Sequence, residues 1–200
     1  HNVRSESQEE ELFLKKYCND NNIIFESITL NNYKENNFEN EARNKRYKFY
    51  EKIIKKYHAK YLFLAHHGDD LIETIIMKIN RGSNLEGYAG LKEISIRDNY
   101  YIVRPFLKYT KEDILEYNKK HNIKYFIDKT NNDTKYTRNR IRKNILPALK
   151  EENKNIHKQF LKYSKTLLEY NNYIETITIN NIKSISKDNY ILLDKFNKLD

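Results

Sequence analysis

A short apolar segment followed directly by an amphipathic helix constrains the fold of this chain most. The segment Tyr61–Ala65 is apolar throughout, which is typical of a strand that is buried on both faces in a parallel sheet. From Leu71 to Ile79 apolar residues recur at helical spacing, and the turn at Gly82 is expected to end this helix. A strand that leads into a helix is the unit of α/β folds, so we expect the apolar strip of the helix to face a sheet.

Similar sequence patterns predict the other helices and strands of the chain. Periodicity and capping residues predict helices over about 7–19, 38–57, 110–121, 141–149 (kinked at Pro147) and 156–182, and strands over 23–30, 100–106, 123–127 and 190–193. This alternation predicts an α/β fold with a Rossmann-like, mostly parallel sheet and flanking helices over residues 1–150. Residues 151–200 are expected to begin a helical domain.

The overall charge favours a polyanionic partner. The chain has 37 Lys and Arg against 28 Asp and Glu, a net charge of +9, which is typical of proteins that bind nucleic acid or anionic membranes. A codon bias that favours Lys, Asn, Ile and Tyr is the other explanation. No apolar run reaches the roughly eighteen residues of a membrane span, so we expect no membrane partner. The single cysteine, Cys18, excludes an internal disulfide and fits a cytoplasmic location.

Polar residues gather where the Tyr61–Ala65 strand ends and the helix begins. They are His66, His67, Asp69, Asp70, Glu73 and Thr74. Ligands of open α/β sheets bind at the carboxyl ends of strands, and a helix start offers free N–H groups to phosphate. Carboxylates there can hold Mg²⁺ or accept a proton, and histidines can bind phosphate oxygens. The alternatives are favourable charges in a first helical turn, or a metal site, although adjacent histidines on an extended segment point in opposite directions.

Several motifs in order resemble the tRNA(Ile)-lysidine synthetase family, whose members are ATP pyrophosphatases with a PP-loop. They are Asn40–Tyr47 (NEARNKRY), Ala65–Thr74 (AHHGDDLIET), Arg81–Leu91 (RGSNLEGYAGL), Ile102–Leu107 (IVRPFL), Asp128–Asp133 (DKTNND) and Tyr136–Arg142 (YTRNRIR). The resemblance runs from His1 to about Ser164. It implies a cytoplasmic enzyme, a carbon–nitrogen ligase that uses ATP and Mg²⁺. In this family ATP adenylates the wobble cytidine of tRNA(Ile), and the ε-amine of L-lysine then displaces AMP, which changes AUG decoding to AUA.

The resemblance also implies roles for individual residues. Asp70 would be the base that accepts the amine proton, or a Mg²⁺ ligand. His66 would contact the phosphate or the modified carbon, and Arg46 would face the adenylate or the lysine carboxylate, although an exposed surface charge is the alternative for Arg46. The residues expected to bind substrate are His67, Glu73, Thr74 and Arg81. A homodimer, and an organellar rather than a bacterial compartment, are left open.

A basic stretch follows these motifs. Residues 135–165 hold ten Lys or Arg and only two acids, Glu151 and Glu152. Basic side chains in a row can face a phosphate backbone, and tyrosines can stack on exposed bases. The residues expected to bind RNA are Tyr136, Arg138, Arg140, Arg142 and Lys143. A solvated helical face is the alternative.

One family feature is absent from the printed sequence. The family begins with a strand and a Ser-Gly-Gly-x-Asp-Ser loop that cradles pyrophosphate, and none of the four glycines lies in such a loop. The resemblance places that strand and loop upstream of His1, so we expect a truncated chain that is inactive alone and lacks much of the C-terminal tRNA-binding part. Three alternative functions stay open: a PP-loop tRNA thiolase, for which one cysteine fits poorly; an all-helical phosphohydrolase with His and Asp metal ligands; and a non-catalytic RNA-binding module.

Overall fold

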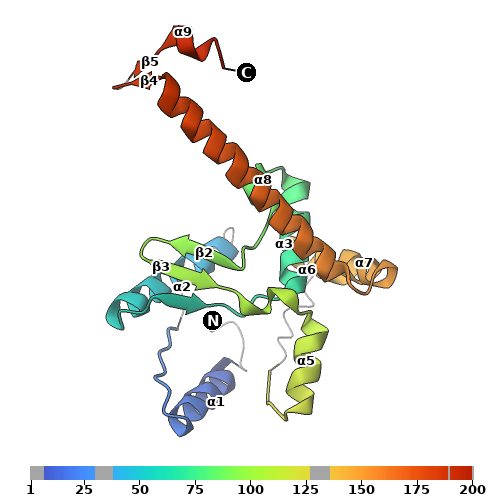
Figure 1. Cartoon of the computed structure of the whole chain (residues 1–200). Coiled ribbons are helices and arrows are strands. Elements are labelled where there is room, and N and C mark those ends of the chain that lie inside the picture. The colour runs from blue at the N-terminus through green and yellow to red at the C-terminus, as the bar shows by residue number, and fades with distance from the viewer. Residues whose placement is uncertain (1–6, 30–37, 127–135, 189, 200) are drawn as a thin grey trace. The chain divides into compact units, whose positions relative to one another are not determined.

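The computed structural model describes residues 7–29, 38–126, 136–188 and 190–199, so the Asp128–Asp133 motif lies outside the described residues. The chain divides into two compact units, each of which is described by itself. Unit 1 comprises the described residues of 1–64, 94–103 and 124–127. Unit 2 comprises the described residues of 65–93, 104–123 and 128–200 (Figure 1).

Unit 1 is a small sheet with helices. Its elements are α1 (Ser7–Asp20), α2 (Phe38–Lys56), β1 (Tyr61–Phe63), β2 (Ile94–Arg97) and β3 (Tyr100–Val103). The strand order is β1-β3-β2. Strand β1 pairs with β3 in parallel, with Leu62 opposite Ile102, whereas β2 pairs with β3 antiparallel. The predicted α/β class is therefore confirmed. Both strands of the parallel pair form, but they are shorter than predicted: β1 stops at Phe63 rather than Ala65, and β3 stops at Val103 because a 3-10 turn begins at Pro105. Strand β2 was not predicted.

The hairpin between β2 and β3 had a weak signal in the sequence. Asp98 and Asn99 form its turn, and Asp98 has a φ of 48°. Asp and Asn tolerate this left-handed region better than other residues with a side chain, and tight hairpin turns require it. The turn is short enough that β2 and β3 must pair antiparallel, which gives the sheet its mixed character.

Three expectations for strands in this region are wrong. Strand β1 is not buried on both faces, because Tyr61 is 55% and Phe63 is 66% exposed, whereas the opposite face, with Ile102 at 4%, is buried. Residues 23–29 and 123–126 form no regular secondary structure. A β-branched sequence becomes a strand only where a neighbouring strand pairs with it, so local composition misled the prediction at both places.

Unit 2 is mainly helical. Its elements are α3 (Gly68–Arg81), α4 (Leu85–Tyr88), the 3-10 turn η2 (Pro105–Lys108), α5 (Lys111–Lys120), α6 (Thr137–Arg140), the π segment η4 (Ile141–Ile145), α7 (Leu146–Glu152), α8 (Ile156–Ile185), β4 (Ser186–Lys187), β5 (Tyr190–Ile191) and α9 (Leu193–Phe196). The helices predicted over 71–81, 110–121 and 156–182 are confirmed. Of the strand predicted over 190–193, only Tyr190–Ile191 is one, and it pairs with β4.

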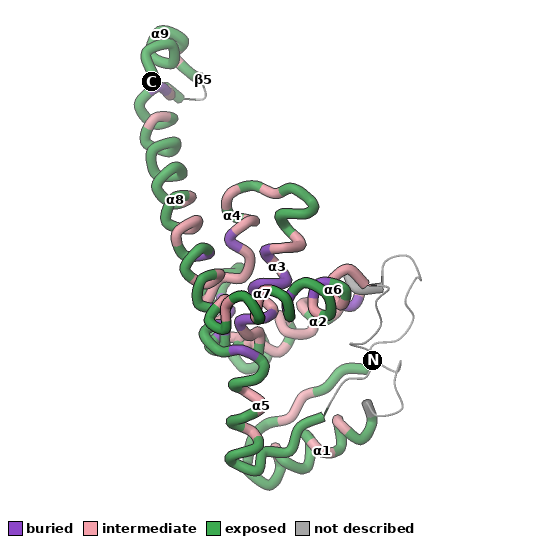
Figure 2. Tube along the Cα trace, turned by 90° about the vertical axis from the view of Figure 1, so that its right-hand side faces the viewer, coloured by how far each residue is buried: buried purple, intermediate pink, exposed green. Residues whose placement is uncertain are grey.

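The core of unit 2 lies between α3 and the first turns of α8. Leu71, Ile75 and Leu107 are completely buried, with Phe160 and Leu161 of α8 against them. Figure 2 colours the trace by burial and shows buried stretches, in purple, along α3. The predicted apolar strip of α3 is therefore the buried face, and within unit 2 its neighbours are η2, α4 and α8. Ile79 was expected in the buried strip, and this expectation is wrong, because the side chain is 56% exposed near the end of the helix.

Local sequence signals set two helix boundaries as predicted. Thr110 begins α5 with a capping box: its hydroxyl accepts from Asp113 N at 3.0 Å, and its N–H donates to Asp113 Oδ2 at 2.8 Å. A kink was expected near Pro147, and there the structure has the π segment η4, which ends just before α7, with Leu146 N–H donating to Ile141 O. Pro147 has no N–H to donate, so the regular ladder cannot continue through it. Within the described ranges, no helix is both long and apolar enough to cross a membrane.

Candidate active site

The start of α3 is held by a close contact between backbones. The N–H of Gly68 donates to Tyr109 O at 2.7 Å. A Cβ at Gly68 would lie 3.0 Å from that oxygen and 3.2 Å from Cβ of His157. Glycine suits this position because any side chain would press against these atoms. The contact holds the start of α3, and with it the carboxylates that follow, beside the turn before α5 and the start of α8.

The first of these carboxylates is buried and paired. Asp69 is 3% exposed, and its Oδ2 lies 2.9 Å from Lys150 Nζ and 3.3 Å from the backbone N of Lys111. Lys150 also lies 2.6 Å from Glu112 Oε2. Burial alone would lower the pKa of Lys150, but the hydrogen bonds to Glu112 and Asp69 outweigh it and raise that pKa. Lys150 is therefore a fixed cation in this unit.

The second carboxylate, Glu73, is completely buried between two arginines. Arg138 Nε donates to Oε2 at 2.8 Å, and Arg142 donates from Nε to Oε1 at 2.6 Å and from Nη2 to Oε2 at 3.0 Å. Burial works against the charge of Arg142, but its bonds to Glu73 raise the pKa of the guanidinium overall. A bidentate pair of this kind fixes both partners in direction as well as in charge.

Asp70 lies at the edge of the same cluster. Its Oδ2 accepts from the N–H of His67 at 3.0 Å and lies 3.4 Å from His67 Nε2, while Oδ1 lies 3.4 Å from Arg142 Nη2. Its side chain is 14% exposed, which leaves it in reach of a small molecule. Thr74 Oγ1 donates to the carbonyl oxygen of Asp70 at 2.7 Å and accepts from Arg138 Nη2 at 3.2 Å. Asp70, Glu73 and Thr74 thus share one strip of α3, as the spacing predicts.

The remaining predicted site residues lie elsewhere. Arg46 is exposed on α2 in unit 1, Arg81 is exposed at the end of α3, and His66 is partly exposed just before α3. In the basic stretch, Lys143 is exposed, and Arg140 donates from Nη2 to Thr137 Oγ1 at 3.0 Å. Tyr136 is the residue immediately before α6.

Sequence reasoning missed what the basic stretch does inside the fold. Arg138, Arg142 and Lys150 neutralise the three carboxylates of α3, although 65 to 81 positions separate the partners. One signal could have found them: buried carboxylates are almost always paired, and the nearest surplus of cations in the sequence is this stretch.

The same geometry bears on the metal hypotheses. No three His, Cys, Asp or Glu side chains gather as metal ligands in the part of the chain that the structure describes. Asp69, Asp70 and Glu73 each lie within 3.4 Å of a basic nitrogen. The all-helical phosphohydrolase alternative is not favoured, because the chain contains a sheet and the carboxylates of α3 are bound to basic side chains.

The fold and the comparison with protein families define the class. A family model described as a PP-loop domain matches residues 1–149. The chain belongs to this family, and the PP-loop domain supports the use of ATP.

The more specific resemblance seen in the sequence is confirmed by curated relatives. The tRNA(Ile)-lysidine synthase of Bacillus cereus is 41% identical over 185 residues, which cover 90% of this chain and 39% of the relative. That of Bacillus subtilis strain 168 is 39% identical over 179 residues, 87% of this chain and 38% of the relative. The bifunctional protein TilS/HprT of Listeria innocua is 35% identical over 205 residues, 98% of this chain and 32% of the relative. The chain spans about two fifths of the length of the first two relatives.

Proposed function

We propose that this chain is the PP-loop part of a tRNA(Ile)-lysidine synthetase, which uses ATP to ligate L-lysine to the wobble cytidine of tRNA(Ile). The observation that carries the proposal is Glu73, a fully buried carboxylate between Arg138 and Arg142, with Asp70 beside it. This cluster lies at a helix start that follows a parallel strand, where α/β folds bind their ligands. The names and identities of the relatives support it.

The proposed reaction has two steps. A cytidine oxygen first bonds to the α-phosphorus of ATP, and pyrophosphate leaves. The neutral ε-amine of lysine then bonds to the carbon that carries this oxygen, AMP leaves with the electrons of the carbon–oxygen bond, and the amine gives up a proton. Asp70 is the residue that we assign to take that proton, because its carboxylate is the most accessible of the three in the cluster.

Other residues take supporting roles in this proposal. Glu73 is a positioning residue, since its carboxylate is completely buried and bonded to both arginines. His67, Thr74 and Arg81 are assigned to substrate binding, and His66 to the phosphate or the modified carbon. The role of Arg46 toward the adenylate or the lysine carboxylate stays a prediction.

The proposed reaction uses ATP together with Mg²⁺. The contacts of Asp70 do not suit a ligand of that Mg²⁺ ion. One oxygen of Asp70 accepts from His67 N–H, and the other lies 3.4 Å from Arg142 Nη2. A cation there would displace or repel the guanidinium group. We therefore route no step through a metal at Asp70.

Contacts with tRNA(Ile) are assigned to Tyr136, Arg138, Arg140, Arg142 and Lys143. Lys143 and Arg140 are exposed, whereas Arg138 and Arg142 offer RNA only the parts of their side chains that face away from Glu73, with 37% and 26% exposed. A cytoplasmic location is part of the proposal and agrees with a tRNA substrate, and a homodimer stays a prediction. The domain boundary at 150 and 151 also stays a prediction: the family match ends at residue 149, whereas the first turns of α8 share the core of unit 2.

The test measures ATP-dependent transfer of labelled lysine to tRNA(Ile) by the protein produced from its complete gene. We expect transfer by the unmodified protein and, in Asp70→Asn, a rate lower by about 100-fold or more, as for loss of a general base. Asp98→Asn, in the exposed hairpin turn of unit 1, is the matched control and should transfer normally. Undiminished transfer by Asp70→Asn would remove Asp70 from the mechanism. A folded protein that transfers no lysine would contradict the proposed function itself.

A further inference from the structure

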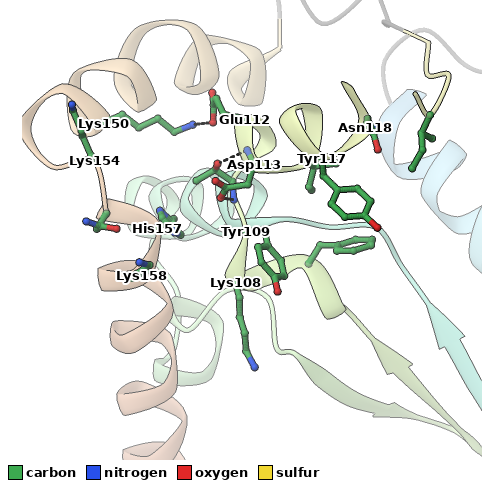
Figure 3. Close-up of a pocket in the computed structure, with 15 residues that line it drawn as sticks. Lys108, Tyr109, Glu112, Asp113, Tyr117, Asn118, Lys150, Lys154, His157 and Lys158 are labelled. Atoms are coloured by element: carbon green, nitrogen blue, oxygen red, sulfur yellow. Dashed lines mark hydrogen bonds and ion pairs between the residues drawn. The ribbon is translucent and has the colours of Figure 1, made fainter. Parts of the chain in front are cut away.

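Unit 2 contains a pocket that the proposed chemistry does not use. It has a volume of about 1160 Å³ and lies between η2 and α5 on one side and the turn from α7 into α8 on the other (Figure 3). Tyr109 and Tyr117 line the first side, and Lys154, His157 and Lys158 line the second. The pocket therefore joins an aromatic wall to a basic one.

The basic wall has charge that the protein does not neutralise. Within the described residues, no acidic side chain lies within ion-pair distance of Lys154 or Lys158. The two acids that line the pocket are engaged: Glu112 with Lys150, and Asp113 with the backbone N–H of Thr110. An anion in the pocket would meet two cations without having to break an existing ion pair.

The start of α8 adds donors to this wall. The helix has no acidic residue in its first turn, and over the described chain the backbone N–H of His157 has no acceptor. The imidazole of His157 is 6% exposed, and its Nδ1 is buried without a hydrogen-bond partner. Nδ1 is therefore shielded from the pocket, and the backbone N–H of His157 is the group that a ligand can reach. A phosphate at this helix start would accept a hydrogen bond from that N–H.

The aromatic wall is open to a flat ligand. Tyr109 is 52% exposed, Tyr117 is 58% exposed and Phe106, which also lines the pocket, is 41% exposed. Proteins that bind single-stranded RNA use exposed aromatic rings beside basic groups in this way, because every base has a face that can stack. The two walls together match a base and its phosphate.

We propose that this pocket binds one unpaired nucleotide of the tRNA substrate, with its phosphate at Lys154, Lys158 and the start of α8, and its base against Tyr117 or Tyr109. This inference rests on the proposed function, because it takes tRNA as the substrate. Lys108 lines the same pocket from the η2 side, but its Nζ lies 3.4 Å from Glu93 Oε1, so the unneutralised cations are Lys154 and Lys158. A polynucleotide is favoured over a free nucleotide because the proposed substrate is a tRNA and exposed rings beside basic groups suit single-stranded RNA.

The test is equilibrium binding of tRNA(Ile) at several salt concentrations by the protein from its complete gene. In the double variant Lys154→Ala/Lys158→Ala, the slope of log affinity against log salt should fall by about 0.7, as expected for one lost phosphate contact to a single strand. In Tyr117→Leu, affinity should fall about 5- to 100-fold at unchanged slope, because a stacking contact carries no charge. Lys183→Ala, on the same helix but outside the pocket, is the control and should keep slope and affinity.

Each outcome decides a different question. If the unmodified protein binds and modifies tRNA(Ile) and the pocket variants bind it equally well with the same slope, the pocket proposal is wrong while the proposed function stands. If the variants lose affinity for ATP but not for tRNA, the pocket is a free-nucleotide site, and the proposal is likewise overturned. If the unmodified protein neither binds nor modifies tRNA, the proposed function fails first. Unchanged circular dichroism spectra of the variants exclude misfolding as the cause.

Discussion

The guanidinium group of Arg142 donates two hydrogen bonds to the buried carboxylate of Glu73, from Nε to Oε1 at 2.6 Å and from Nη2 to Oε2 at 3.0 Å. This pair joins helix α3 to the π segment that begins at Ile141, a separation of 69 positions in the sequence. Because Arg138 bonds to the same carboxylate, Glu73 connects two neighbouring basic residues and fixes the charge beside Asp70. The stability of this region should therefore depend strongly on Glu73.

Glu73→Gln should lower the free energy of unfolding by about 3 kcal/mol. Removing one partner of a buried ion pair costs about 3–5 kcal/mol, and the lower end applies because Arg138 and Arg142 stay partly exposed to water. Urea denaturation followed by circular dichroism measures the change. Glu116→Gln, at an exposed position of α5, is the control and should change stability by less than about 0.5 kcal/mol. Equal stability of the two variants would show that Glu73 does not hold the cluster.

The pH dependence of stability should contain a contribution from His157. Burial lowers the pKa of His157 below the ordinary value of 6.5. The charges of Lys158 and Lys150 lower this pKa further, whereas those of Asp113 and Asp69 raise it without outweighing burial. Between the folded and unfolded pKa values the unfolded chain binds the proton and the folded chain does not. Stability is therefore highest above about 6.5 and falls as pH decreases through the folded pKa.

Unfolding free energies measured from about pH 7.5 to pH 5.5 test this. In His157→Gln the decrease over this range should be smaller than in the unmodified protein, because one protonation site that favours the unfolded chain is gone. Gln159→Ala removes an exposed side chain of the same helix that carries no titratable group, and it should leave the decrease as it is. A steeper decrease in His157→Gln would reverse the sign that burial predicts.

Gly68→Ala should lower the free energy of unfolding by about 1–3 kcal/mol through overpacking. The new methyl group would meet Tyr109 O at 3.0 Å and Leu107 O at 3.3 Å, and backbone atoms cannot turn away as a flexible side chain can. Gly82→Ala makes a useful comparison, since its Cβ would meet nothing within 4 Å and only the positive φ of 76° would oppose it. Thermal unfolding measures the loss of stability in both variants. A dye that binds apolar surface should bind folded Gly68→Ala but not folded Gly82→Ala, because only the methyl group at position 68 meets backbone atoms.

The first turns of α8 should contribute to the stability of unit 2, whereas its middle turns should not. Phe160 packs against the cluster of Leu71, Ile75 and Leu107, while Ile174 is 53% exposed. We expect Phe160→Ala to cost about 3 kcal/mol and Ile174→Ala less than about 0.5 kcal/mol in urea denaturation. Similar small losses in both variants would favour a domain boundary directly before α8.

The local elements near the candidate site could be predicted because their signals are close together in the sequence. The Thr110 and Asp113 capping box, the Pro147 kink and the buried strip of α3 each arise from residues within a few positions of one another. The predictions that failed needed a distant partner. Residues 23–29 have strand composition, but no strand among the described residues pairs with them, and β1 has an exposed face that periodicity alone does not reveal.

By itself, the sequence determined the α/β class, the place of the polar cluster at the start of α3 and the family resemblance, because short-range spacing and ordered motifs encode all three. Only the tertiary structure decided that Arg138, Arg142 and Lys150 pair with Glu73 and Asp69, and that His157 and Lys158 face a pocket with Tyr117. The physical reason is that a buried carboxylate must find a cation somewhere, but which cation reaches it depends on how segments 65 to 81 positions apart fold together.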